Sequence, residues 1–188
     1  KTVPETTEGN EQINNNKPIW LRPPRQVEED DYKEFYKSAF RSSYDEPMKW
    51  THFVLEGQVE CKALLYIPGM LPFELSKDMF DESARNLRLY VKRVFINDKF
   101  DDLMPRWLKF VRGVVDSNDL PLNVSREILQ KPKVLQIINK RLVRKSLDMM
   151  RELADGTKDE ETGEMDNSQY VVFWNNFGKY LKVGVVDD

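Results

Sequence analysis

The sequence predicts an α/β fold, a layered α/β/α sandwich on a mixed sheet followed by helices. Segments with helical spacing of apolar residues and segments with strand-like alternation follow one another in mixed order. Two strand-like segments flank Gly57, which predicts an early hairpin. The chain has 188 residues, of which 40% are hydrophobic and 32% charged, and this composition suits one folded domain with a core and a charged surface.

The N-terminal part is expected to pass from a polar tail into a helix. Residues 1–16 are mostly Thr, Glu, Asn and Gln, and we expect them to be disordered. Residues 18–24 are expected to be extended, with Trp20 as their one large apolar side chain. Residues 28–40 predict a helix, because acidic residues fill its first turn and aromatic residues recur at helical spacing. That aromatic stripe, expected in the core, consists of Tyr32, Phe35, Tyr36 and Phe40.

The middle of the chain is rich in predicted strands. Residues 51–56 and 59–68 should form the hairpin, and Val59, Cys61 and Ala63 alternate with polar residues as in a strand buried on one face. The next expected elements, in order, are a loop over 69–83, a strand over 87–96, a turn over 97–102, a short helix over 105–112 and a strand over 113–116.

The stretch after the last of these strands carries the most suggestive chemistry. Pro121 favours an extended approach, and Asn123 and Ser125 are good N-cap residues, so a short helix should begin near Ser125. Arg126 and Gln130 are four residues apart and project from the same face of that turn. An arginine presented at a helix start after a rigid loop has the geometry of an arginine finger. The alternative is a capped helix with one solvated arginine.

The C-terminal part predicts two helices joined by a loop. The longest helix should cover residues 132–153, beginning at Pro132. Its basic side chains could bind nucleic acid or a phosphorylated ligand, or could form a solvated face. They are Lys133, Lys140, Arg141, Arg144, Lys145 and Arg151. Residues 155–167 are acidic and should form a mobile loop, after which Ser168 is expected to cap a final helix.

Several kinds of site have no support in the sequence. Cys61 is the only cysteine, so no internal disulfide can form, and we expect it to be buried. His52 is the only histidine and has no ligand cluster around it, so we predict no metal site. There is no Gly-rich phosphate loop and no nucleophile-elbow sequence, and the apolar runs are too short for a membrane helix.

The central stretch also resembles a known signature. Leu-Pro-Leu-Asn-Val-Ser-Arg-Glu-Ile-Leu-Gln resembles the catalytic loop of the heat-shock protein 90 chaperones, in their middle domain, and the resemblance spans about residues 17–188. Further stretches agree in the family's order: Lys17-Pro-Ile-Trp20, Glu34-Phe-Tyr-Lys-Ser38, His52-Phe53, Glu56-Gly57, Leu89-Tyr-Val-Lys-Arg-Val-Phe-Ile96 and Gly113-Val-Val-Asp-Ser117. Three others look most like the member of the endoplasmic reticulum: Trp20-Leu-Arg-Pro23, Asp45-Glu-Pro-Met48 and Leu142-Val-Arg-Lys-Ser-Leu-Asp-Met149.

The resemblance implies a division of the chain as well as a fold. The fold would be similar to ribosomal protein S5 domain 2. Residues 1–16 would end a charged linker, and 17–153 would form the middle-domain core with the catalytic loop and the long helix. Residues 154–167 would be the mobile acidic loop, and 168–188 a terminal helix that begins a smaller further segment.

The implied function is that of a middle-domain fragment of an ATP-dependent molecular chaperone active in protein folding and stress response. The fragment would dock on the N-terminal ATP-binding domain, where Arg126 would reach the γ-phosphate. Gln130 matches the neighbouring catalytic glutamine, and Asn123 matches a polar, nucleotide-binding residue of the same loop. ATP and Mg would be bound mainly by the N-terminal domain. The full-length parent would therefore be an ATPase, and the fragment alone would bind no cofactor and catalyse nothing.

The implied partners are the N-terminal domain, client proteins and cochaperones, with a homodimer formed through a C-terminal domain. Trp20 could contact clients or could pack on its own domain. The compartment would be the endoplasmic reticulum lumen, or else the cytoplasm or mitochondrion, with no nucleic acid bound and no membrane insertion. Asn123-Val-Ser125 is a glycosylation acceptor sequence that we expect to be unused. The alternative function is a passive protein-binding module with no role in ATP hydrolysis.

Overall fold

The computed structural model describes the chain in several stretches: residues 17–79, 86–98, 103–121, 132–158, 163 and 165–187. The expected disordered tail over residues 1–16 lies outside them, and so does the predicted short helix that begins near Ser125.

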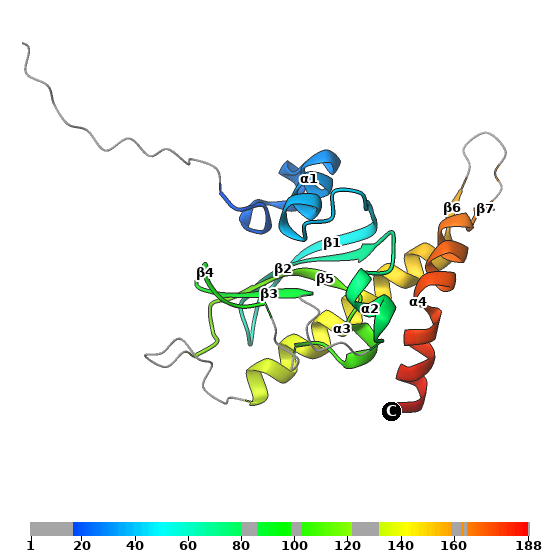
Figure 1. Cartoon of the computed structure of the whole chain (residues 1–188). Helices are drawn as coiled ribbons and strands as arrows, with labels where there is room; N and C mark the ends of the chain where they lie inside the picture. Colours follow the sequence, from blue (N-terminus) through cyan, green and yellow to red (C-terminus); the bar gives the residue numbers. More distant parts are fainter. Residues whose placement is uncertain are drawn as a thin grey trace, which may run out of the picture.

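A five-stranded mixed sheet forms the centre of the molecule, with strands in the order β1-β2-β5-β3-β4 (Figure 1). Only the β3–β5 pair is parallel, and the other three neighbouring pairs are antiparallel. The strands are β1 (Pro47–Leu55), β2 (Cys61–Pro68), β3 (Leu87–Val91), β4 (Val94–Asn97) and β5 (Arg112–Ser117). The predicted mixed sheet is therefore confirmed.

Helices cover both faces of this sheet, which confirms the predicted layered α/β/α sandwich. The helix α1 (Glu29–Ala39) lies on one face, and α3 (Pro132–Asp155) and α4 (Ser168–Asp187) lie on the other (Figure 1). The predicted aromatic stripe packs in the α1 layer, where Tyr36 is fully buried. The long helix begins at Pro132, as the sequence predicts.

The early hairpin forms as predicted, but its second strand is buried on both faces rather than on one. Gly57 takes φ +119° between β1 and β2, a conformation that side chains disfavour. Because β2 lies between β1 and β5, Leu64 packs in the α1 layer while Leu65 packs against the opposite layer. The simple alternation around Cys61 therefore stops at Ala63.

The prediction of a single strand over residues 87–96 is wrong, because the chain reverses at Lys92 and Arg93. Both residues have positive φ, 50° and 68°, and the reversal separates β3 from the edge strand β4. Backbone N–H groups hold the turn: Lys92 donates to the Ser117 carbonyl over 3.1 Å, and Arg93 donates to the Asp116 carboxylate over 3.2 Å. A turn without Gly, Asn or Pro gave no local signal.

Three other segments differ from their predictions. Two 3₁₀ helices, η1 (Ile19–Leu21) and η2 (Pro24–Gln26), replace the extended segment 18–24. A short helix, α2 (Phe73–Lys77), forms inside the predicted loop 69–83, and the helix expected over 105–112 shortens to η4 (Arg106–Leu108).

Paired strands also replace part of the loop predicted over 155–167. These strands are β6 (Thr157–Lys158) and β7 (Met165–Asp166). At the start of α4, the Asp166 carboxylate accepts the Ser168 N–H over 2.8 Å. Asp166 therefore satisfies a backbone N–H at this end of the helix, where Ser168 was expected to act as the cap.

Candidate functional site

The predicted catalytic residues Asn123, Arg126 and Gln130 lie outside the described residues, but both ends of their segment are described. β5 leads into the segment at Ser117, and α3 follows it from Pro132. The structure therefore describes the two ends of the segment that carries the candidate site, at the end of β5 and the start of α3.

The chain leaving β5 is tied to the start of β2. The Asp119 carboxylate accepts the backbone N–H of Glu60 over 2.5 Å, and the Asn118 N–H donates to the Glu60 carbonyl over 3.1 Å. The Asn118 side chain donates to the Glu60 carboxylate over 3.2 Å, and Leu120 is buried. These contacts fix where the chain departs from the sheet toward Arg126.

A buried carboxylate at the end of β5 joins three parts of the fold. Asp116 is only 5% exposed, and its Oδ2 accepts the indole N–H of Trp20 over 3.1 Å. Its Oδ1 accepts the backbone N–H of Arg93 in the β3–β4 turn. Asp116 thus connects η1, the β3–β4 turn and the strand that leads to the loop. Its sequence signal was a charged residue inside an apolar strand, and we did not assign it a role from the sequence.

Trp20 is 8% exposed and packs on its own domain. Its ring lies 4.9 Å from that of Tyr90 and 5.8 Å from that of Phe35, measured between centroids. Of the two interpretations of Trp20, packing on its own domain is the one that this burial supports, since a client contact needs exposed surface.

His52 takes a structural position beside Trp20. Its Nε2 lies 3.2 Å from the Trp20 carbonyl, which can only accept, so Nε2 carries the proton and Nδ1 accepts the Tyr32 hydroxyl proton over 2.8 Å. Burial lowers the pKa of His52 and favours this neutral form. In the described stretches, no three His, Cys, Asp or Glu side chains gather as a metal ion would require.

Cys61, the first residue of β2, is buried as predicted. Burial raises the pKa of its thiol to about 12, so the side chain stays protonated and is a poor nucleophile.

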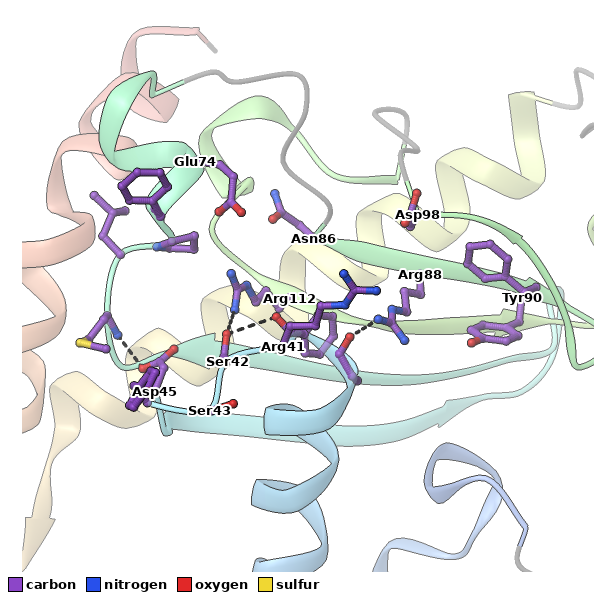
Figure 2. Close-up of a pocket in the computed structure, with 18 residues that line it drawn as sticks. Arg41, Ser42, Ser43, Asp45, Glu74, Asn86, Arg88, Tyr90, Asp98 and Arg112 are labelled. Atoms are coloured by element: carbon purple, nitrogen blue, oxygen red, sulfur yellow. Dashed lines mark hydrogen bonds between the residues drawn. The ribbon is translucent and has the colours of Figure 1, made fainter. Parts of the chain in front are cut away.

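A second candidate site is a pocket of about 1000 Å³ beside the C-terminal end of α1. Arg41, Arg88 and Arg112 line it from the segment after α1, from β3 and from β5, and their side chains lie next to one another in Figure 2. Arg88 donates to the Ala39 carbonyl at the end of α1. We did not single out these arginines from the sequence, in which they are far apart.

Arg112 is the buried member of this group, at 9% exposure. Its Nη1 donates to the Ser42 hydroxyl and, over 3.4 Å, to the Tyr36 hydroxyl. The Tyr36 hydroxyl in turn donates to the Asp45 carboxylate over 2.5 Å. Burial and this hydrogen bond raise the pKa of Tyr36, so a neutral phenol separates the Arg112 charge from Asp45.

The rim of the same pocket exposes large apolar side chains. Tyr44 is 96% exposed and Phe73 is 69% exposed, and Met70 and Phe95 are about half exposed. Tyr44 stands in a short segment between α1 and β1, and Phe73 begins α2. A surface that combines exposed rings with cations suits contact with other polypeptides.

The basic residues of α3 have the character of a solvated face. Lys133, Arg141 and Arg144 are exposed, and Lys145 pairs with Asp148 over 3.7 Å. None of the described helices is long and apolar enough to cross a membrane.

Comparison with known proteins gives consistent matches. The family model described as Hsp90 protein matches residues 1–188. An endoplasmin homolog of Hordeum vulgare is 46% identical over all of this chain, and the chloroplastic heat shock protein 90-5 of Arabidopsis thaliana is 49% identical over 95% of it. Among solved structures, the middle domain of a Plasmodium falciparum putative heat shock protein matches with TM-score 0.72 and 48% identity, over 91% of this chain and 60% of that one.

The chain spans only about a quarter of these curated relatives, 25% of the Hordeum protein and 22% of the chloroplastic one. The names of these relatives point to more than one compartment.

Proposed function

This chain belongs to the Hsp90 family and has the fold of that family's middle domain, and on this basis we propose that it serves as the middle domain of an ATP-dependent molecular chaperone. Its role in the parent protein is to dock on the N-terminal ATP-binding domain and to complete the site of hydrolysis.

The observation that carries the proposal is the anchored departure of the chain from β5. Asp119 and Asn118 hold the chain on Glu60, and the family's arginine signature follows within ten residues, at Arg126. A loop fixed at its base can present a guanidinium repeatedly in one orientation, and such preorganisation is the main source of electrostatic catalysis.

Three residues of this loop have separate roles in the proposal. The Arg126 guanidinium stabilises the charge that grows on the phosphoryl oxygens during hydrolysis. Gln130, whose four-residue spacing from Arg126 predicts a shared helix face, adds a neutral hydrogen bond, and Asn123 contributes a polar contact to the nucleotide. Keeping Arg126 on a separate domain makes hydrolysis conditional on closure.

ATP and Mg belong to the N-terminal domain in this proposal. This chain has no Gly-rich phosphate loop, and its described residues hold no group of three metal ligands. In the proposal, Arg126 and its neighbours supply transition-state contacts, and the domain that binds ATP supplies the metal-assisted chemistry.

Client contact is the second part of the proposed role. With Trp20 buried, the exposed rings of Tyr44 and Phe73 are the better candidates, because they can lose solvent-exposed apolar area when a client binds. The parent would form a homodimer through a C-terminal domain and could bind cochaperones. We place it in the endoplasmic reticulum lumen, since endoplasmin homologs recur among the relatives, with the chloroplast as the competing location.

Nucleotide-dependent docking tests the proposal against a passive protein-binding module. The isolated chain and the parent's N-terminal domain would be mixed with a non-hydrolysable ATP analogue, with ADP or without nucleotide, and their affinity measured by titration calorimetry. We expect tighter association with the ATP analogue, and a loss of that preference in Arg126→Ala. Equal affinity under all three conditions would favour the passive module.

A further inference from the structure

Three arginines, Arg41, Arg88 and Arg112, line the pocket beside α1, and the carboxylates of Glu74 and Asp98 line it as well. Among the described residues, the ion pairs are made by other side chains, and none joins Arg41, Arg88 or Arg112 to Asp or Glu. Asp45 also lines the pocket, but its two oxygens are taken by the Tyr36 hydroxyl and the Met70 N–H.

Arg88 and Arg112 are held close to one another by the fold. They extend from neighbouring strands, β3 and β5, and both guanidinium carbons face the ring of Phe40, at 5.5 Å and 5.8 Å from its centroid. Two like charges held near the same ring repel each other. An anion placed between them would remove this repulsion.

Arg112 shows most clearly that this arrangement is incomplete. The side chain is nine-tenths buried, and its hydrogen-bond partners among the described residues are two neutral hydroxyls. Its Nε is buried and has no hydrogen-bond partner among those residues. A buried guanidinium is costly unless a carboxylate or phosphate shares its charge. The forked donor pattern of arginine fits such a group in two parallel hydrogen bonds.

The surroundings favour an anion carried by a polypeptide over a small ion. The pocket is large, about 1000 Å³, and its rim exposes Tyr44, Met70 and Phe73. A bare ion would leave these apolar side chains in water, whereas a peptide with an acidic and an apolar side chain next to each other would use both features.

We propose that this arginine pocket, formed by Arg41, Arg88 and Arg112, binds a side-chain carboxylate of a polypeptide, with a neighbouring apolar side chain of that polypeptide on the Tyr44–Phe73 rim. The inference rests on the proposed client contact and adds a chemical preference to it, for Glu or Asp beside a large apolar residue.

Two capped, fluorescent peptides test this preference on the 188-residue chain. One carries a central Phe-Glu pair, the other Phe-Gln, and binding is followed by fluorescence anisotropy. We expect the Glu peptide to bind about tenfold more tightly, because a charge-assisted pair is worth about 1.5 kcal/mol. High salt should reduce the difference. Arg88→Gln should abolish it, and so should Arg112→Gln if that buried change leaves the fold intact.

Matched controls make the result specific. Arg144→Gln removes an exposed arginine from α3, on the other side of the sheet, and should leave the Glu preference unchanged. Arg41→Gln changes the pocket at an exposed position, so this variant tests the pocket without the risk of misfolding that the buried Arg112→Gln change carries.

Each contrary result overturns a distinct part of the inference. Equal binding of the two peptides would leave client contact standing and overturn the carboxylate preference, whereas binding of neither would overturn both. Competition by inorganic phosphate without a Glu preference would assign the pocket to phosphate groups instead. An equal loss of the Glu preference in Arg144→Gln would show that the preference reflects the overall charge of the chain and not the arginine pocket.

Discussion

The indole N–H of Trp20 donates to the carboxylate of Asp116 over 3.1 Å, across 96 residues of sequence. Both side chains are more than nine-tenths buried. This hydrogen bond joins η1, at the start of the described chain, to the end of β5, from which the predicted catalytic loop departs. This hydrogen bond therefore links the packing of the N-terminal segment to the position of the strand end from which the loop departs.

Removing either partner of this hydrogen bond should destabilise the domain. Trp20→Phe leaves Asp116 Oδ2 unpaired, and Asp116→Asn removes the charge that strengthens the bond, so we expect each to lower the free energy of unfolding by about 1–3 kcal/mol. The double variant should lose about 1 kcal/mol less than the sum, because the two changes remove one shared interaction. Urea denaturation measures all four free energies.

Trp174→Phe is the matched control, since Trp174 is 41% exposed on α4 and should respond little. Strict additivity of Trp20→Phe and Asp116→Asn would contradict an energetic coupling between them.

The β3–β4 turn should be stabilised by residues that suit positive φ. Lys92→Asn combined with Arg93→Gly places in the turn the pair that two-residue hairpins prefer, and retains the backbone N–H that Arg93 donates to Asp116. We expect the free energy of unfolding to rise by about 1 kcal/mol. In Lys92→Ala/Arg93→Ala, which keeps Cβ atoms at both positions, no gain should follow; a similar gain there would attribute the effect to lost charge.

The elements with strong periodicity were predictable from the sequence, and those fixed by distant contacts were not. The aromatic stripe of α1 and the start of α3 at Pro132 both carry local signals, helical spacing and a residue suited to the first turn. The reversal at Lys92–Arg93 carries none, because its hydrogen bonds come from Asp116 and Ser117 on another strand.

The same distinction applies to the sites. Arg126 stands in a contiguous motif, so sequence alone could nominate it. The arginine pocket collects residues from three separate segments, and only the pairing of β3 with β5 brings Arg88 and Arg112 together. No spacing rule along one segment predicts such a cluster.

Cys61 should remain unreactive toward thiol reagents until the domain unfolds. Because burial raises its pKa from 9.0 to about 12, the folded state holds the proton more tightly than the unfolded state. The resulting stability is fully present below about pH 9 and is lost, at about 1.4 kcal/mol per pH unit, as the pH rises from about 9 toward 12.

Measurement of the unfolding free energy against pH checks this predicted loss of stability, with Cys61→Ala as the comparison. Tyr36 and Tyr66 have raised pKa values too and contribute to the alkaline loss in both proteins. The difference between the two curves isolates the thiol, and parallel curves above about pH 9 would show that the thiol is not protected.

Exposed rings at the pocket rim should matter for client binding and not for folding. Tyr44→Ser with Phe73→Ser should weaken binding of an unfolded client about tenfold, since burying exposed aromatic surface contributes about 1–2 kcal/mol. The free energy of unfolding should change by less than about 0.5 kcal/mol. Val185→Ser/Val186→Ser removes apolar side chains that are 82% and 83% exposed on α4, and serves as the control. Equal weakening in both variants would remove the rim from this role.

Arg126→Ala in the full-length parent should lower ATP turnover while leaving ATP affinity nearly intact. The N-terminal domain holds the nucleotide in the ground state, so binding should be nearly unchanged, whereas the phosphoryl charge would lose its guanidinium in the transition state. Arginine fingers contribute about 10³-fold or more to the rate of the chemical step. We expect about 10–10³-fold here, because domain closure also limits turnover.

Conservative variants separate charge from geometry at this loop. Arg126→Lys should restore only part of the turnover, since a point ammonium cannot reproduce the fork of a guanidinium. Gln130→Ala should be milder than Arg126→Ala, because a neutral amide contributes less than a charge. Arg144→Ala, on the exposed face of α3, should behave as wild type. Steady-state turnover and nucleotide affinity are measured on each folded dimer, and wild-type turnover in Arg126→Ala would return this loop to a purely structural role.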